Sequence, residues 1–272
     1  MCFNIIIFNP SKSNLMNIFG SIERYARINN DGFSLVSFDP HRYLRTLDLN
    51  EYKATLPSVA NAKLVHIHFR AGTSGTITLD NVHMWKIHDF YVSHNGYVGE
   101  YSFFYTPYTD PAVKWTKNIN SDTYELVHSK EFQELIENRD WKELIKFLNK
   151  KSFYGVLLMN NEYEIVAFSR LKPFYIMSYG DMLMFSNTLL SLEKSIKVFG
   201  IRLMKTIPYK AIEDKLIVFD IERKRIAEQY ENKEKYKYAY ERNDEKKEYK
   251  ESWSWSYYDY DYWGERYKTW EY

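Results

Sequence analysis

Met1-Cys2-Phe3-Asn4-Ile5-Ile6-Ile7-Phe8, at the start of the chain, is the stretch on which the interpretation of the fold depends. Ile5–Phe8 is a short apolar run, which predicts a buried β-strand. Cys2, just before this run, is the only cysteine of the sequence. If Met1 is removed, Cys2 carries a thiol and a free α-amine, whose unperturbed pKa of about 7.7–8.0 lets it take the thiol proton. The alternative is that Cys2 is a small buried hydrophobic residue near a chain end.

The composition limits the class of protein. With 272 residues, the chain can form one large domain, or one domain with an appendage. The net charge of +1 gives no general case for nucleic acid or an acidic partner. A single cysteine excludes an intramolecular disulfide framework and a cysteine zinc site. Nothing resembles a signal peptide and no apolar run approaches the ~20 residues of a membrane helix, so we expect a soluble cytoplasmic protein with no membrane partner.

Beyond the first strand, the hydrophobic pattern predicts blocks of helices and blocks of strands. We expect helices at about residues 14–27, 122–137, 140–150 and 187–198, and a weaker helix or a loop at 43–59. We expect strands at residues 33–38, 64–70, 89–94, 153–159, 164–170, 174–179, 182–186 and 215–222. Because these elements do not alternate as βαβ units, the pattern favours an α+β sandwich of antiparallel sheets over a doubly wound parallel sheet.

The chain changes character at about Arg223. Residues 223–250 are dense in Lys, Glu and Tyr, which predicts a solvated or self-paired helix. Residues 251–272 are mildly acidic and crowded with Trp and Tyr, whereas a disordered solvating tail is poor in aromatic residues. We therefore expect this tail to pack on the body of the protein, on a partner or on a sister subunit. Stacking on single-stranded nucleic acid needs a basic groove, so nucleic acid is not the expected partner.

Several short motifs occur in a fixed order along the chain. They are Met1-Cys2 at the start of a strand, Asn30-Asp31-Gly32-Phe33, His68-Phe69-Arg70-Ala71-Gly72-Thr73-Ser74-Gly75, Asn81-Val82-His83, Ser93-His94-Asn95-Gly96 and Ser121-Asp122-Thr123. The ordered set resembles the class II glutamine amidotransferase domain of the N-terminal-nucleophile hydrolase superfamily, in particular its stand-alone phage and microbial versions. The resemblance covers roughly residues 1–220. It implies a four-layer α/β/β/α sandwich of two antiparallel sheets at residues 1–222, followed by a helical and aromatic-rich extension at residues 223–272.

The resemblance also implies catalytic roles. Cys2 would attack the side-chain amide of glutamine, with its own α-amine acting as base and then as acid to the departing ammonia. Asn95 and the backbone N–H of Gly96 would form the oxyanion hole, since fixed donors at a sharp turn need no reorganisation as charge develops. On its own, the Asn95-Gly96 dipeptide is also typical of the tight turn of a β-hairpin.

Three further residues match positions that bind the substrate. Arg70 would hold the α-carboxylate, a task that suits the guanidinium fork, and Asp122 would hold the α-ammonium group. Thr73 matches a threonine of the binding pocket. The alternatives are that Arg70 forms a surface ion pair and that Asp122 only caps the helix that follows it.

The histidines of these motifs raise the question of a metal site. His66 and His68 alternate on one predicted strand face, but no carboxylate completes a recognisable ligand set with them, with His83 or with His94. We therefore expect packing or supporting roles for these histidines, no metal and no cofactor.

We expect a cysteine-dependent glutaminase or amidotransferase that hydrolyses glutamine, or a related small amide, through a γ-glutamyl thioester on Cys2. The roughly 50 residues after the core contain no phosphate loop or dinucleotide fingerprint, so the ammonia acceptor would be a partner protein or absent. The competing interpretation is a non-catalytic structural or binding protein, such as a viral one, that retains the fold and self-associates through its aromatic tail. Departures from the family pattern favour it: Ile28-Asn29 replaces an arginine-glycine pair, Ser74 a histidine, and Met84 a proline.

Overall fold

The structure is a computed structural model that describes residues 2–72, 75–98, 120–170, 174–186, 209–212 and 214–231. The chain divides into one compact unit, Met1–Asn232, and a second, Lys233–Tyr272, which lies wholly outside the described residues. None of the described helices is long and apolar enough to cross a membrane.

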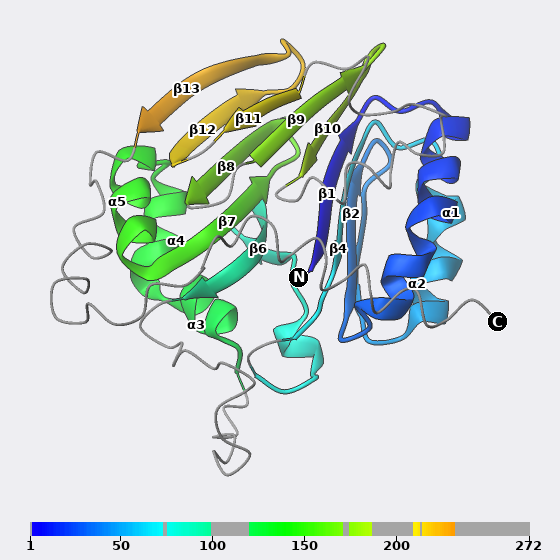
Figure 1. Ribbon diagram of the computed structural model, residues 1–272, viewed down its shortest axis with the longest axis horizontal. Coiled ribbons are helices and arrows are strands. Elements are labelled where there is room, and N and C mark those ends of the chain that lie inside the picture. The colour runs from blue at the N-terminus through cyan, green and yellow to red at the C-terminus, as the bar shows by residue number, and fades with distance from the viewer. Residues whose placement is uncertain are drawn as a thin grey trace, which may run out of the picture. The chain divides into compact units, whose positions relative to one another are not determined.

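Two antiparallel sheets form the centre of the first unit (Figure 1). One sheet contains, in spatial order, β11 (Tyr209–Ile212), β9 (Phe174–Tyr179), β10 (Met182–Ser186), β1 (Phe3–Phe8), β4 (Leu64–Phe69), β2 (Phe33–Phe38) and β3 (Arg42–Thr46). The other contains β13 (Arg225–Glu231), β12 (Lys215–Asp220), β8 (Glu164–Arg170), β7 (Ser152–Met159), β6 (Phe90–Val98) and β5 (Trp85–Ile87). The first is called the β1 sheet below and the second the β6 sheet.

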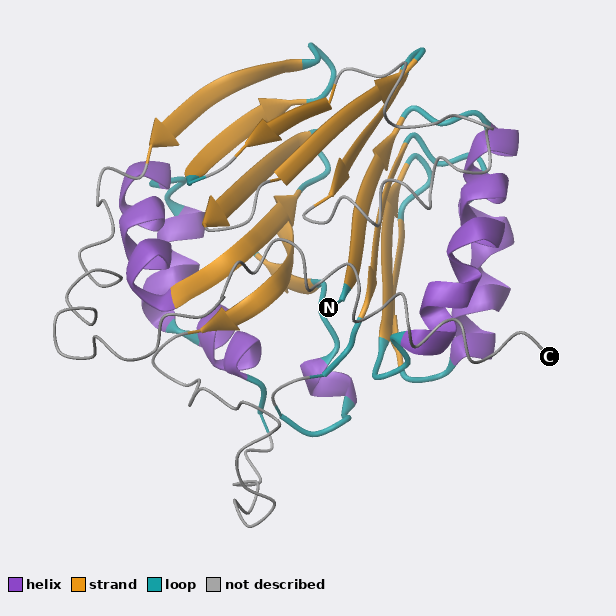
Figure 2. Cartoon of the chain, in the orientation of Figure 1, coloured by secondary structure: helices purple, strands orange, loops and turns teal. Residues whose placement is uncertain are grey.

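Helices cover the outer face of each sheet (Figure 2). On the β1 sheet lie α1 (Lys12–Ile28), α2 (Leu49–Thr55) and the 3-10 helix η1 (Leu56–Val59). On the β6 sheet lie α3 (Asp122–His128), α4 (Lys130–Glu137) and α5 (Trp141–Lys151). A second 3-10 helix, η2 (Leu79–Asn81), precedes β5. The predicted α/β/β/α sandwich is therefore confirmed.

Strand β1 shows how the sequence specifies these layers. Phe3, Ile5 and Ile7 pack in the core beneath α1 and α2, whereas Ile6 and Phe8 pack in the core between the two sheets. Since β1 is paired on both edges, with β4 and with β10, and is covered on both faces, its sequence is almost continuously apolar. A third core lies between the β6 sheet and its helices. Cys2 directly precedes β1, at the end of the sheet where β4 finishes.

Three sequence predictions were wrong in detail. Strand β6 does not end at Asn95-Gly96, and this dipeptide is not a hairpin turn: the strand continues to Val98, and Gly96 pairs with Tyr154 of β7. Pairing with a distant strand thus overrides the local turn preference. The helix expected at residues 122–137 is two helices, because Ser129 ends α3 and its side chain caps α4. The region 43–59 contains part of strand β3 as well as helix.

The helix expected from Arg223 is also wrong for its first part, since residues 225–231 form β13. A β-bulge between Val218 and Phe219 shifts the register of β13 against β12. As a result Ile226 packs toward the core between the sheets, while Tyr230 packs toward the helices on the other face. This two-sided packing explains why a charged segment extends the sheet. The helices expected at 187–198 and beyond 231, and the aromatic tail, lie outside the described residues.

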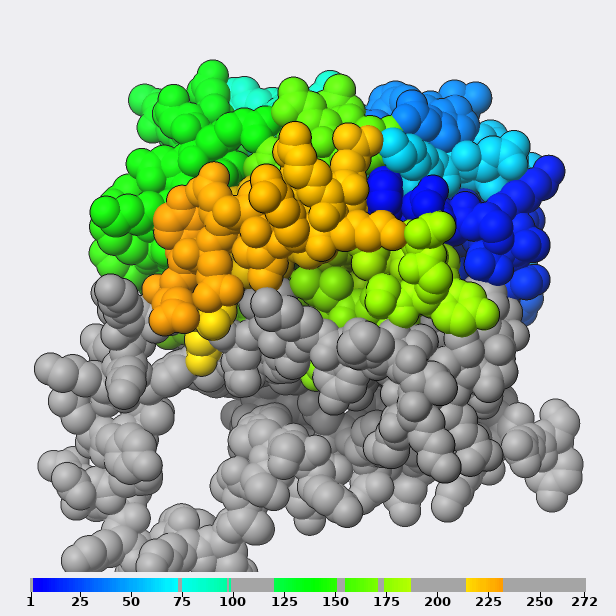
Figure 3. All heavy atoms as spheres, turned by 90° about the horizontal axis from the view of Figure 1, so that it is seen from above, coloured from blue at the N-terminus to red at the C-terminus, as the bar shows by residue number. Residues whose placement is uncertain are grey.

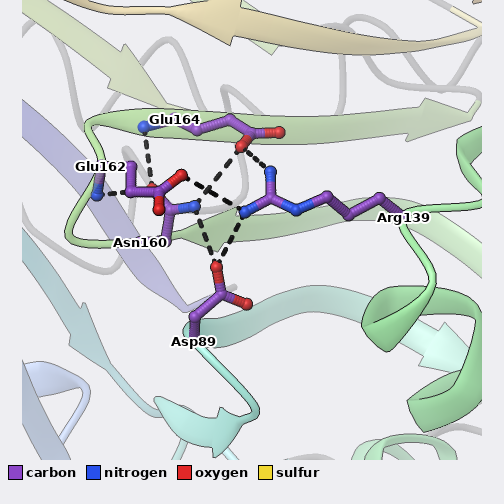
Figure 4. A network of polar contacts seen from close by, with 5 residues as sticks. All are labelled: Asp89, Arg139, Asn160, Glu162 and Glu164. Carbon is purple, nitrogen blue, oxygen red and sulfur yellow. Dashed lines mark hydrogen bonds and ion pairs between the residues drawn. The ribbon is translucent and has the colours of Figure 1, made fainter.

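The hairpin ends of the sandwich carry a cavity and a polar network. A cavity of about 340 Å³ lies at the end opposite Cys2, between the β9–β10 and β12–β13 pairs, which Figure 3 shows from above in yellow-green and orange. On the β6 sheet, Arg139 contacts Asp89 at 2.9 Å, Glu162 at 3.5 Å and Glu164, and Asn160 reaches two of these carboxylates (Figure 4). Arg139 thereby connects the α4–α5 loop to the β5–β6 and β7–β8 turns.

Candidate active site

Cys2 lies against the segment that follows β4. The Ala71 N–H donates to Cys2 Sγ at 3.3 Å, and the thiol faces the Ala71 carbonyl at 3.6 Å. Burial of the sulfur raises the pKa of the Cys2 thiol, although the Ala71 contact and the charge of Arg70 act in the opposite direction. Burial prevails, so the resting sulfur is a protonated thiol that needs a base before it can act as a nucleophile.

Arg70 follows β4 and is only 2% exposed, so it does not form a surface ion pair. Its Nη1 donates to the Thr76 carbonyl at 3.3 Å. Burial lowers the pKa of Arg70, while Cys2, Asp31 and Asp122 favour its charged form. A guanidinium remains charged in proteins, so the structure holds a buried positive charge near the thiol and two carboxylates.

Asn95 is the residue of β6 that lies beside Cys2. Its Nδ2 donates to the Cys2 carbonyl at 3.0 Å, which joins the ends of two strands from opposite sheets. Asn95 is 3% exposed, so its amide is fixed by its surroundings. The next residue, Gly96, has a φ of 149°, a conformation in which a glycine avoids the strain of a side chain. The structure therefore brings Asn95 to Cys2, and Gly96 follows it on a strand rather than on the expected turn.

Asp122 is the first residue of α3, but it is not the cap of that helix. Ser121 is the cap, and its side chain accepts a hydrogen bond from the Tyr124 N–H at 3.0 Å. The Asp122 carboxylate instead accepts from the Val98 N–H and from the Thr123 N–H, each at 2.8 Å. These bonds connect the end of β6 to the start of α3.

Asn81 connects the Arg70 region to α3, a role that the sequence did not reveal. Its Nδ2 donates to the Thr76 carbonyl at 2.9 Å, and its Oδ1 accepts from the Ser121 N–H at 2.7 Å. Gly75 packs at the same junction with a φ of +72°, where an added Cβ would lie 2.6 Å from the Ser121 nitrogen. The motif containing Asn81 was visible in the sequence, but its contacts are between segments distant along the chain.

Three buried histidines lie between Asn95 and α3. His68 stacks on His83 with the ring centroids 4.0 Å apart, and the His94 N–H donates to His83 Nδ1 at 3.4 Å. His94 Nδ1 in turn lies 2.9 Å from Thr123 Oγ1. Burial lowers the pKa of His68 to about 3, although a contact with Asn95 acts in the opposite direction, and it lowers the pKa of His83 well below the usual value. His68 and His83 are therefore neutral packing residues.

His66 belongs to a separate buried group between the sheets. Its Nε2 lies 2.8 Å from Asn4 Oδ1 and 3.1 Å from Ser93 Oγ, and Asn4 Nδ2 donates to the same hydroxyl at 2.9 Å. Burial lowers the pKa of His66 well below its usual value. Among the described residues there is no group of His, Cys, Asp or Glu that could hold a metal ion. Thr73 lies outside the described residues.

The arrangement of the layers defines a class of fold. Two antiparallel sheets packed face to face, with helices on both outer faces, characterise the N-terminal-nucleophile hydrolase fold. Among solved structures, the chain aligns with a glutamine phosphoribosylpyrophosphate amidotransferase from B. subtilis, determined with ADP and GMP, with a TM-score of 0.50 and 13% identity over 85% of this chain and 49% of that chain.

A structure described as the allosteric regulatory enzyme of purine biosynthesis gives the same TM-score of 0.50 and 13% identity, over 82% of this chain and 47% of that chain. The sequence matches no protein-family model and no curated protein. The chain therefore has the N-terminal-nucleophile hydrolase fold of class II glutamine amidotransferases, and it spans about half the length of these two enzymes.

Proposed function

We propose that the chain hydrolyses the side-chain amide of glutamine, or of a related small amide, with Cys2 as the nucleophile. The observation that supports this most directly is the hydrogen bond of 3.0 Å between Asn95 Nδ2 and the Cys2 carbonyl. It fixes a side-chain amide donor beside a thiol at the head of a strand. A bound substrate amide at Cys2 would then lie within reach of a preorganised donor.

The proposed reaction has two halves. With Met1 removed, the α-amine of Cys2 takes the thiol proton, and Sγ attacks the amide carbon of the substrate. Asn95 and the Gly96 N–H stabilise the resulting oxyanion; the C–N bond then breaks, and the α-ammonium gives its proton to the leaving ammonia. Water, deprotonated by the same amine, attacks the γ-glutamyl thioester, which releases glutamate and restores the thiol. No cofactor enters this sequence.

Two buried charges support an amino-acid substrate. The Arg70 guanidinium suits a carboxylate, and the Asp122 carboxylate suits an ammonium group. Arg70 and Asp122 act on the same site as Cys2, because the charges of Asp122 and of Cys2 each favour the charged form of Arg70. Thr73 would complete the pocket.

The test is the intact mass of the full chain before and after incubation with a diazoketone analogue of glutamine. We expect loss of Met1, one adduct on Cys2 and release of ammonia from glutamine. Cys2→Ala should abolish ammonia release without unfolding the protein, because it removes only one sulfur. Unchanged turnover in this variant, or retained Met1 with no adduct, would refute the proposal.

A non-catalytic role for the same fold is the second candidate. It is favoured by Ile28-Asn29, which ends α1 where the family has an arginine-glycine pair. The mass experiment separates the two candidates. If ammonia is released, a partner protein that accepts it would be sought next, by adding candidate acceptors and measuring glutamine consumption.

A further inference from the structure

Asp31, two residues before β2 begins, holds the turn that carries Arg70. The Asp31 N–H donates to the Arg70 carbonyl at 3.1 Å, and Asp31 Oδ2 accepts from the Gly72 N–H at 2.6 Å. One residue therefore binds both ends of the segment Arg70-Ala71-Gly72. The middle residue of this segment is Ala71, which contacts the Cys2 sulfur.

Gly72 in turn packs on the guanidinium group. A Cβ added at Gly72 would lie 3.1 Å from each of three Arg70 atoms, Cζ, Nη1 and Nη2. A point equally distant from these three atoms at that range lies above the plane of the guanidinium, not beside its edge. The Gly72 backbone thus covers one face of the fork, and the hydrogen bond from Gly72 to Asp31 holds this cover in place.

We propose that Asp31 is the positioning residue that fixes the plane of the Arg70 guanidinium, and with it the orientation of an α-carboxylate bound there. The proposal rests on the proposed function, in which Arg70 binds the substrate carboxylate. Bidentate binding requires the two planes to match, so a fork that can rotate loses affinity even though its charge is unchanged.

Asp31 acts in two separable ways. Its Oδ2 is an acceptor for the turn, and its charge favours the charged form of Arg70 and the protonated form of Cys2. Asp31→Asn keeps an acceptor oxygen and removes the charge, whereas Asp31→Ala removes both. Neither change touches the reacting atoms.

The experiment measures the kinetics of glutamine hydrolysis by the full chain. We expect Asp31→Ala to raise KM about tenfold to hundredfold with kcat within about threefold, the effect of a charge-assisted hydrogen bond. Asp31→Asn should restore most of the KM. Asp31→Asn should also lower the pH midpoint for alkylation of Cys2 by iodoacetamide, because this variant removes a negative charge near the thiol. Asp80→Asn, a matched change at an exposed acidic residue of η2, should alter neither.

A double variant separates positioning from general support of the fold. In an Arg70→Ala background, Asp31→Ala should raise KM no further, because no guanidinium remains to be positioned. An additional loss of the same size as in the wild type would overturn the proposal. If Asp31→Ala does not fold, Gly72→Ala gives the second test. Its methyl group would lie 3.1 Å from the guanidinium, which must shift by a few tenths of an ångström, so we expect KM to rise; an unchanged KM would also overturn the proposal.

Binding of L-glutamate, measured by calorimetry, distinguishes failure of this inference from failure of the proposed function. Glutamate carries the same α-carboxylate and α-ammonium groups, and its binding needs no turnover. If the wild type releases no ammonia but binds glutamate, the proposed function fails, and weaker binding by Asp31→Ala with recovery in Asp31→Asn would still support the positioning role. Equal affinities in all three proteins, or no binding by the wild type, would overturn it.

Discussion

Tyr52 is a buried tyrosine whose hydroxyl has no hydrogen-bond partner among the described residues. It lies on α2, 3% exposed, with its ring 5.2 Å from Phe69 and 5.9 Å from Phe33. Burial alone raises the pKa of Tyr52. On folding, the hydroxyl thus lost its hydrogen bonds to water and gained none from the part of the chain that the structure describes. We expect Tyr52→Phe to make the protein more stable.

The size of the effect follows from two opposing terms. Burying an unpaired hydroxyl costs about 1–3 kcal/mol. Removing the oxygen leaves a void of about 10–15 Å³, which costs about 0.3 kcal/mol. The net stabilisation is about 1 kcal/mol or more, which corresponds to a rise in Tm of about 2–4 °C for a unit of this size. Urea unfolding followed by circular dichroism measures the free energy directly.

Tyr43→Phe is the matched control. The Tyr43 hydroxyl donates to the Met84 carbonyl at 2.9 Å, so the same substitution removes a formed hydrogen bond and should cost about 0.5–1.5 kcal/mol. The two variants should therefore shift stability in opposite directions. A loss of stability in Tyr52→Phe equal to that in Tyr43→Phe would refute the reasoning.

Three further predictions concern charge and the C-terminal region. The pKa of His68 is lowered to about 3 in the folded protein, from about 6.5 in the unfolded chain. The stability that depends on neutral His68 is therefore complete above a pH of about 6.5 and is lost as the pH falls toward 3. His68→Gln should make the acid side of a plot of Tm against pH less steep. Arg139→Ala should lower stability by about 1 kcal/mol, a small value because the side chain is 39% exposed, and Arg139→Lys by less; an effect that does not weaken in 1 M salt would contradict an ionic origin. Deletion of residues 251–272 should change self-association in sedimentation experiments but leave the Tm of the first unit unchanged, since these residues belong to the second unit, Lys233–Tyr272. A lower Tm would place the tail in the fold.

The sequence predicted the layers well because their signal is local. Alternating or continuous apolar residues in segments such as Phe33–Phe38 and Leu64–Phe69 specify strands that are covered on both faces. The errors arose where a distant partner decides the outcome. Asn95-Gly96 remains extended because β7 pairs with it, and residues 225–231 form a strand because β12 provides an edge.

The candidate site shows the same division. Cys2, Arg70, Asn95 and Asp122 could be selected from motif order, and the structure brings them near one another. The roles of Asp31 and Asn81 could not be inferred, because each binds backbone groups of segments far along the chain. Spacing along a sequence does not reveal which peptide groups a side chain will reach.

The central position of β1 has a consequence for the order of events during synthesis. Its partner β10 begins at Met182, so at about 5–20 residues per second the ribosome delivers that partner roughly 10–30 s after β1 has emerged. Until then one edge of β1 is unpaired. An aminopeptidase acting on the nascent chain would therefore meet Met1 before the strand that follows it is paired on both edges.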